Sequence, residues 1–176
     1  LWVGSYSQKD PLAKYNKITG RTELFNASPR RIYSICKTRA GVLLLGHSEG
    51  LSYMKDGAFH RIPFFTRVVH EVMEDSRGEL WVSSGHDGLW HYRGGNLEDK
   101  SAWEQFKHNP EDEFSLPSNI VTSSFEDSRS QIWVTTESGG FCRKDPSSRK
   151  FIRYPYYTSF KISEDSKGLF WITTIK

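Results

Sequence analysis

Features that mark membrane-spanning, disulfide-stapled or nucleic-acid-binding proteins are scarce in this sequence. Its 176 residues include only two cysteines, too few for a small secreted disulfide framework. No apolar run approaches the roughly 20 residues that span a bilayer. The net charge is +3 and the basic residues are scattered, so we expect no nucleic-acid binding. The chain opens on Leu1 without a signal peptide, and we expect the native N-terminus to be missing.

The sequence also lacks the motifs of common catalytic and metal sites. Its six histidines show neither His-x-His nor His-Glu-x-x-His spacing, and no Gly-x-Ser-x-Gly or phosphate-cradling loop is present. We therefore expect no metal and no cofactor, and we expect this chain not to be an enzyme itself. Cys36 and Cys142 lie in different repeats with a whole repeat between them, which predicts that they form no disulfide and are small apolar side chains.

Tryptophan-centred strand signals recur along the chain. Four of them read Leu-Trp-Val-Gly, Leu-Trp-Val-Ser, Ile-Trp-Val-Thr and Phe-Trp-Ile-Thr, and a fifth copy has leucine in place of tryptophan. The central residues are Trp2, Leu44, Trp81, Trp133 and Trp171, separated by 37 to 52 residues. A repeat of about 40 residues built from short strands predicts a β-propeller. The position of the tryptophans in every unit predicts that they fill the space between blades.

The clearest repeat unit covers residues 68–106 and contains four short strands joined by tight turns. One turn, Glu-Asp-Ser-Arg-Gly, contains Asp75, which can accept backbone N–H groups, and Gly78, which can adopt a positive φ. Asp127, Asp165 and Gly168 occupy the equivalent places in later units. Four antiparallel strands in chain order make one blade, so the fold class is all-β.

The repeats divide the chain into three complete blades flanked by two partial ones. The boundaries are a partial blade at 1–26, blades at 32–62, 68–107 and 120–154, and a partial blade at 160–176. Two architectures fit this division: an open arc of about four blades from a larger ring of the seven-bladed type, which we favour, or a closed four-bladed ring. The longest interval between tryptophans has two insertions, 94–101 and 107–118, which we expect to be surface loops.

These motifs resemble a known family. The string Asp-Ser-(Arg/Lys)-Gly-x-(Leu/Phe)-Trp-(Val/Ile), intact with its glutamate at 74–81 and 164–171, resembles the two-component-regulator propeller repeat. The segment 108–119 resembles the His-x-Pro-x-Asp-x-x-Ser-Leu-x-x-Asn linker between such repeats. The resemblance covers nearly the whole chain and is poorest at 38–45.

The resemblance implies a role in signalling. In that family such repeats form the N-terminal periplasmic sensor of bacterial hybrid two-component systems, and many members sense glycan fragments. The family's propellers precede a β-sandwich, a membrane helix, a histidine kinase, a receiver and a DNA-binding domain. The resemblance therefore implies that this chain is periplasmic, binds a small molecule or oligosaccharide, and contacts the membrane only through segments absent here. It also implies that the rest of the propeller, and a second copy in a homodimer, are its partners.

In propellers the first strand of each blade lies innermost, and ligands bind where loops converge near the axis. Residues entering these strands, and the loops after the tryptophan strands, vary while the scaffold repeats. Their cationic, aromatic and polar side chains suit an oligosaccharide, with or without a carboxylate. The candidate ligand contacts are Arg30, Arg31, Tyr33, Arg67, His70, His86, Asn119, Tyr156 and Tyr157.

Two other functions stay open at this point. The first is a protein-interaction or dimerisation scaffold. The second is a streptogramin-lyase-like enzyme, whose repeats also contain Asp-x-x-Gly-x-x-Trp; His70 and Glu71 are the nearest candidates for its histidine and acid.

Overall fold

The computed structural model describes residues 1–5, 12–25, 29–155 and 158–174. Within this part of the chain it contains seventeen strands and one three-residue 3₁₀ helix. The all-β prediction is confirmed. Among the same residues, no helix is long and apolar enough to cross a membrane.

The strands form five antiparallel sheets, each built from consecutive strands. The first sheet contains β1 (Trp2–Gly4), β2 (Leu12–Tyr15) and β3 (Thr22–Leu24). The second contains β4 (Ile32–Lys37), β5 (Leu43–His47), β6 (Gly50–Lys55) and β7 (Ala58–Arg61). The third contains β8 (Val69–Glu74), β9 (Leu80–Ser84), β10 (Leu89–Tyr92) and β11 (Trp103–Phe106), with η1 (Lys100–Ala102) before β11. The fourth contains β12 (Val121–Glu126), β13 (Ile132–Thr136), β14 (Phe141–Lys144) and β15 (Phe151–Tyr154), and the fifth β16 (Ser159–Glu164) and β17 (Phe170–Thr174).

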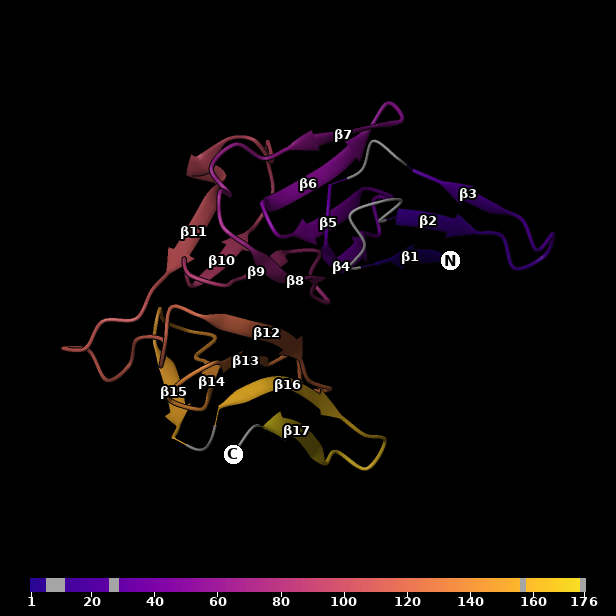
Figure 1. Cartoon of the computed structure of the whole chain (residues 1–176). Coiled ribbons are helices and arrows are strands. Elements are labelled where there is room, and N and C mark those ends of the chain that lie inside the picture. Colours follow the sequence, from indigo (N-terminus) through magenta and orange to yellow (C-terminus); the bar gives the residue numbers. More distant parts are fainter. Residues whose placement is uncertain (6–11, 26–28, 156–157, 175–176) are drawn as a thin grey trace.

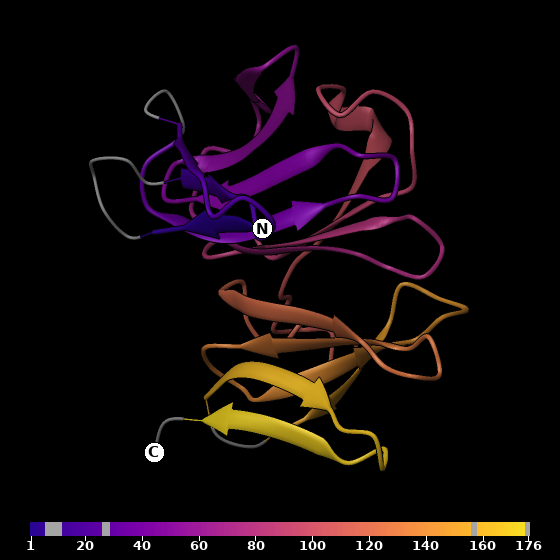
Figure 2. The same ribbon diagram turned by 90° about the vertical axis from the view of Figure 1, so that its right-hand side faces the viewer.

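The five sheets follow one another as blades of an open arc. Figures 1 and 2 show the first and fifth sheets at opposite ends of the molecule, with the other three between them in chain order. The strands that begin the complete sheets lie side by side on the inside: β8 contacts both β4 and β12, and β12 contacts β16. The predicted open arc is therefore the observed architecture.

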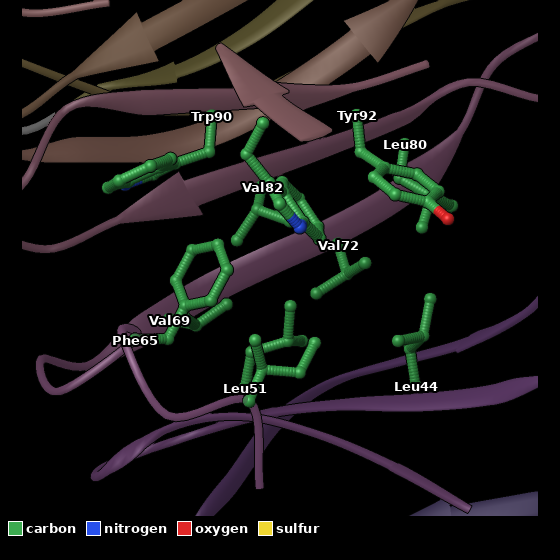
Figure 3. Packing of buried hydrophobic residues seen from close by; sticks show 11 residues of the cluster. Leu44, Leu51, Phe65, Val69, Val72, Leu80, Val82, Trp90 and Tyr92 are labelled. Atoms are coloured by element: carbon green, nitrogen blue, oxygen red, sulfur yellow. The ribbon is translucent and has the colours of Figure 1, made fainter. Parts of the chain in front are cut away.

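The hydrophobic core lies between successive sheets. One cluster joins the second and third sheets through Leu44, Leu51, Val72 and Trp90 (Figure 3). Trp90 and Trp103 stand outside the repeated tryptophan position but are also buried, since their rings pack against Phe65 at 5.2 and 5.1 Å. Both cysteines are free thiols, and burial raises the pKa of each.

The repeated tryptophans face the following sheet. Trp81 is 2% exposed because the fourth sheet covers it, and Trp133 is 8% exposed and packs against Phe170 of the fifth sheet at 4.9 Å. The prediction of a buried position is wrong for Trp171, which is 64% exposed, since no strand of the described chain covers that face. Trp2 is only half-buried, against Phe25.

Each turn aspartate also holds the tryptophan of its own sheet. Oδ2 of Asp75 accepts the indole N–H of Trp81 at 3.0 Å, while Oδ1 accepts the backbone N–H groups of Arg77 and Glu79 at 2.9 Å each. Asp127 and Asp165 make the same three kinds of contact with their turns and tryptophans. The second sheet has Leu44, whose side chain has no N–H to donate, and Thr38 stands in the place of the aspartate.

The glutamate and serine of the same motif connect neighbouring sheets. Glu126 accepts the backbone N–H and the hydroxyl of Ser76, both at 2.6 Å. Glu164 accepts the same two groups of Ser128, at 2.7 and 2.9 Å. Glu74 likewise accepts the backbone N–H of Arg39 at 2.8 Å. We call this contact the glutamate latch, because each carboxylate closes the turn of the preceding sheet.

Of the two insertions in the third repeat, the earlier is a surface loop in which only Leu97 is half-buried, and the later is only partly a surface loop. Residues 109–114 are exposed, as expected, but Ser115 and Leu116 are buried. Leu116 inserts between the third and fourth sheets, and Arg153 donates to its carbonyl oxygen at 3.0 Å. In the earlier insertion, the Trp103 indole donates to the carbonyl of Leu97, which ties that loop to the sheet.

Candidate functional site at the innermost strands

The innermost strands share a deformation that the sequence did not predict. The antiparallel register shifts by one residue in all four, within the pairings of β4, β8, β12 and β16 with the strands that follow them. The extra residues are Tyr33, His70, Thr122 and Phe160. A bulge of this kind redirects a side chain and is common beside binding sites. We call these four residues the bulge row.

The bulge row lies on one face of the arc, where the inner strands begin, and the loops after the tryptophan strands lie on the same face. Ile32 pairs with His47, Val69 with Ser84, and Val121 with Thr136, so the start of each inner strand meets the end of the next. His47 itself is buried and structural, with Nδ1 accepting the Glu49 N–H and Nε2 near the Ser52 hydroxyl. This face is the mouth at which the sequence placed its candidate site.

Three members of the bulge row contact the next inner strand. The rings of Tyr33 and His70 meet edge to face at 5.9 Å. Nδ1 of His70 lies 3.0 Å from the carbonyl oxygen of Val121, so Nδ1 is the protonated nitrogen and Nε2 an acceptor in the neutral ring. The Thr122 hydroxyl donates to the carbonyl of Ser159 at 2.7 Å. The row is therefore continuous across the described inner strands.

The predicted ligand contacts fall into three groups. Arg30, Arg31, Tyr33, Arg67 and His86 are exposed at the mouth, and His70 is half-buried beside them. Asn119 is a structural residue: its side-chain oxygen accepts the His108 N–H and its carbonyl accepts the Gly88 N–H. Tyr156 and Tyr157 lie outside the described residues.

Thr122 and Phe160 were missed by sequence reasoning. Aligning the four units on their tryptophans would have put both beside Tyr33 and His70, but a one-residue bulge leaves no mark in a pattern of alternating residues. Phe160 and Tyr33 are both 38% exposed, so two aromatic faces are accessible in the row.

The residue after His70 belongs to a separate network. Glu71 accepts the Ser124 N–H at 3.1 Å and the Ser123 hydroxyl, and the Lys161 ammonium lies 3.1 Å from its other oxygen. These contacts join the third, fourth and fifth sheets across the inner strands. Glu71 therefore has donors on both oxygens, and His70 is bonded elsewhere.

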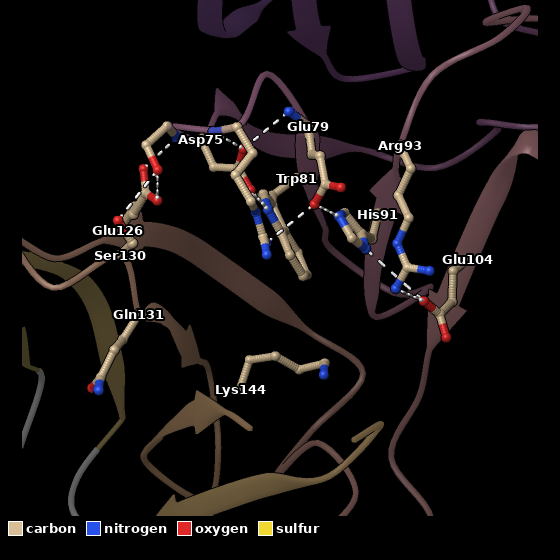
Figure 4. A network of polar contacts seen from close by, with 12 residues as sticks. Asp75, Glu79, Trp81, His91, Arg93, Glu104, Glu126, Ser130, Gln131 and Lys144 are labelled. Carbon is tan, nitrogen blue, oxygen red and sulfur yellow. Dashed lines mark hydrogen bonds and ion pairs between the residues drawn. The ribbon is translucent and has the colours of Figure 1, made fainter. Parts of the chain in front are cut away.

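A second polar cluster lies away from the mouth, between the third and fourth sheets (Figure 4). Ligand atoms of Asp75, Glu79 and His91 lie within 4.8 Å of one another, a spacing that a metal ion could use. Arg77 competes for that place, because its Nη2 lies 3.4 Å from Asp75 and 3.1 Å from Glu79. The guanidinium already supplies the positive charge that a metal would bring.

His91 is the buried member of this cluster. It is 3% exposed, stacks on Trp81 at 3.8 Å, and places Nε2 2.9 Å from Glu79. Burial lowers the pKa of His91, although the neighbouring carboxylate of Glu79 opposes the shift. Its Nδ1 has no hydrogen-bond partner among the described residues, with Glu104 Oε2 3.9 Å away.

Comparison with known proteins places the repeat and the fold. Residues 115–138 match the family model described as two component regulator propeller. No curated protein matches the chain.

Several solved structures share the fold. The extracellular domain of a protein described as a hybrid two component system of B. thetaiotaomicron is 21% identical, with a TM-score of 0.73 over 84% of this chain and 22% of its own. PorZ, a surface component of the type-IX secretion system of Porphyromonas gingivalis, is 13% identical, with a TM-score of 0.70 over 97% of this chain and 29% of its own. Virginiamycin B lyase from Staphylococcus aureus is 12% identical, with a TM-score of 0.71 over 99% of this chain and 59% of its own.

The chain thus spans between about a fifth and three fifths of the length of these proteins. At such identities the likeness concerns the fold, while the family match rests on the fourth repeat. The order of the sheets, the repeated Asp–Trp hydrogen bonds and the matched segment all indicate a chain of repeated propeller blades. The chain is an arc of β-propeller blades in which residues 115–138 match the two-component regulator propeller repeat.

Proposed function

We propose that this chain is part of the extracytoplasmic, periplasmic sensor of a hybrid two-component signalling protein. In this proposal the mouth of the arc binds an oligosaccharide and the full-length protein relays binding to a histidine kinase. The observation that carries the proposal is the bulge row: four inner strands share one deformation, and a different side chain occupies it in each. Constant geometry with varied chemistry is what a ligand-specific surface on a repeated scaffold requires.

The chemistry of the mouth supports a sugar ligand. Tyr33 and Phe160 offer aromatic faces, and Nε2 of His70 can accept a hydroxyl. Exposed Arg67 can donate two parallel hydrogen bonds to a diol or carboxylate. The matched repeat and the likeness to an extracellular domain of a hybrid system support the cellular setting.

A lyase-like activity is the second candidate, because a virginiamycin lyase shares the fold. The contacts of its candidate pair disfavour it. Glu71 is paired with Lys161 and two donors of β12, and His70 donates to Val121, so neither residue has the other as a partner in a proton transfer. If the chain is a protein-interaction scaffold, the bulge row binds no small ligand.

The test is ligand-dependent stabilisation of the protein. We would screen neutral and uronate-containing oligosaccharides by thermal shift and then compare the double variant Arg67→Ala/His70→Ala. The matched control is Arg129→Ala/His60→Ala, which removes an exposed arginine and an exposed histidine away from the mouth. We expect the first variant to fold and to lose the stabilisation, and the control to retain it.

Equal stabilisation of both variants would contradict binding at the mouth. A screen without any ligand, combined with a dimer that dissociates when Phe160 is replaced by serine, would favour the scaffold. Turnover of a streptogramin that disappears in Glu71→Gln would favour the lyase.

A further inference from the structure

A polar cleft of about 280 Å³ opens between the third and fourth sheets, away from the bulge row. Trp81, His91 and Arg93 of the third sheet line one side, and Gln131 and Lys144 of the fourth sheet the other (Figure 4). Trp81 and His91 are both buried, so the cleft presents no aromatic face for stacking. Its recognition chemistry is therefore that of its charged rim.

Cations outnumber acids on that rim. Arg77, Arg93 and Lys144 line the cleft, whereas Glu79 is its one acidic lining residue among the described residues. Glu79 already accepts a hydrogen bond from His91 and forms an ion pair with Arg77. Arg93 forms an ion pair with Glu104, whose Oε2 lies 3.3 Å from Nη2 of Arg93. The two acids thus fix the positions of the guanidinium groups, which carry more donors than these pairs use.

Lys144 is the cation whose charge is least balanced. Its ammonium donates to the carbonyl oxygens of Asp145, at 2.7 Å, and Ser148, and lies 5.4 Å above the Phe106 ring. No carboxylate forms an ion pair with it in the described part of the chain. Burial lowers the pKa of Lys144, so an anion placed nearby would stabilise its charged form.

We propose that this cleft binds a small ligand bearing an oxyanion, held by Lys144, Arg77 and Arg93. A carboxylate, a sulfate and a phosphate share the required chemistry, which is a compact group of acceptor oxygens with negative charge. This site is separate from the mouth and stands whether or not the mouth binds a sugar.

The test is NMR titration of the protein with sulfate, acetate and glucuronate, each compared with chloride at equal ionic strength. The indole N–H signal of Trp81 reports the cleft. The Trp171 indole is the internal control, since it makes the same hydrogen bond to an aspartate at the far end of the arc. We expect saturable shifts at Trp81 but not at Trp171.

Variants separate specific binding from screening of charge. Lys144→Met keeps the length and apolar contacts of the side chain and should weaken binding about tenfold or more. Arg93→Gln, at an exposed rim position, should weaken it about threefold. Lys150→Met is the matched control, because Lys150 also lies over a ring, that of Phe114, but is in the turn before β15 and outside the cleft. The proposal is overturned if Trp81 shows no saturable shift with any of the three anions, or if Lys144→Met and Lys150→Met bind equally.

Discussion

Replacing Asp75 with alanine should destabilise the protein strongly, and the same change at Asp165 should destabilise it less. Both aspartates accept two turn N–H groups and one indole N–H, with nearly the same distances. They differ in burial, because Trp81 is 2% and Trp171 64% exposed. The chain thus contains its own control: the same three hydrogen bonds, with and without access to water.

The expected magnitude follows from which donors water can reach. After Asp75→Ala, the Trp81 indole N–H is buried without a partner, which costs roughly 1–3 kcal/mol. The two turn N–H groups are near the surface and lose about 1 kcal/mol each, since water replaces the carboxylate. The total is about 3–5 kcal/mol. The same two turn N–H groups are lost at Asp165, but water can reach the Trp171 indole N–H, so we expect a loss that is smaller by roughly 1–3 kcal/mol.

The assay is urea denaturation of both variants, together with a double-mutant cycle. Trp81→Phe removes the indole donor, so Asp75→Ala should cost about 1–2 kcal/mol less in that background than in the parent. Equal costs for Asp75→Ala and Asp165→Ala would refute the reasoning from burial. A coupling energy near zero would show that the indole hydrogen bond contributes nothing.

The acid dependence gives a further check on the same residue. Burial alone would raise the pKa of Asp75, but hydrogen bonds from Trp81, Glu79 and Arg77 hold the pKa below its ordinary value of 3.8. A lowered pKa in the folded state means that this contribution to stability is complete above pH 3.8 and is lost as the pH falls through the folded value. In Asp75→Asn that part of the acid dependence should disappear.

Two other outcomes are expected. Glu126→Ala removes the glutamate latch to Ser76 and should lower the free energy of unfolding, measured by urea denaturation, by about 1–2 kcal/mol. Glu137→Ala removes an exposed glutamate that follows β13 and should change the free energy of unfolding little. Equal effects of the two variants would mean that the latch does not stabilise the packing of the sheets. Burial, with a smaller contribution from Arg61, lowers the pKa of His47 from 6.5 to about 4, so the unfolded chain binds the proton first and stability should fall by up to about 3 kcal/mol as the pH drops from 6.5 to 4. His47→Gln should flatten that slope, and a parent protein equally stable across this window would contradict the burial of a neutral ring.

Some features of this protein could be predicted from sequence because they depend on neighbours in the chain. The Asp-Ser-x-Gly turn is local: Asp75 reaches N–H groups two and four residues ahead, and Gly78 adopts the positive φ of 86° that the absence of a Cβ atom allows. The spacing of the tryptophans predicted the length of the repeat unit, and the short strands and tight turns within each unit predicted the order of the strands in a blade. These features recur wherever the motif recurs, so a single sequence contains several copies of the evidence.

Other features depend on which sheet comes next, and a repeat cannot report that. Trp81 and Trp171 occupy the same position of the same motif, yet one is core and the other surface, because only one has a sheet packed against it. Leu116 looked like part of a polar loop but fills the gap between two sheets.

The candidate sites divide in the same way. Sequence variation alone pointed to Tyr33, His70 and the exposed arginines, because side chains that break a repeat can be found by comparing its copies. The bulges at Thr122 and Phe160 needed the register, and the cleft at Lys144 needed two sheets side by side. The sequence by itself determined the blade and its local hydrogen bonds, whose partners lie a few residues apart. Only the tertiary structure decided the bulge row, because a one-residue shift between neighbouring strands leaves no mark in the order of residues. It also decided burial and the cleft, because these arise from contacts between segments about 40 or more residues apart, which the order of residues does not encode locally.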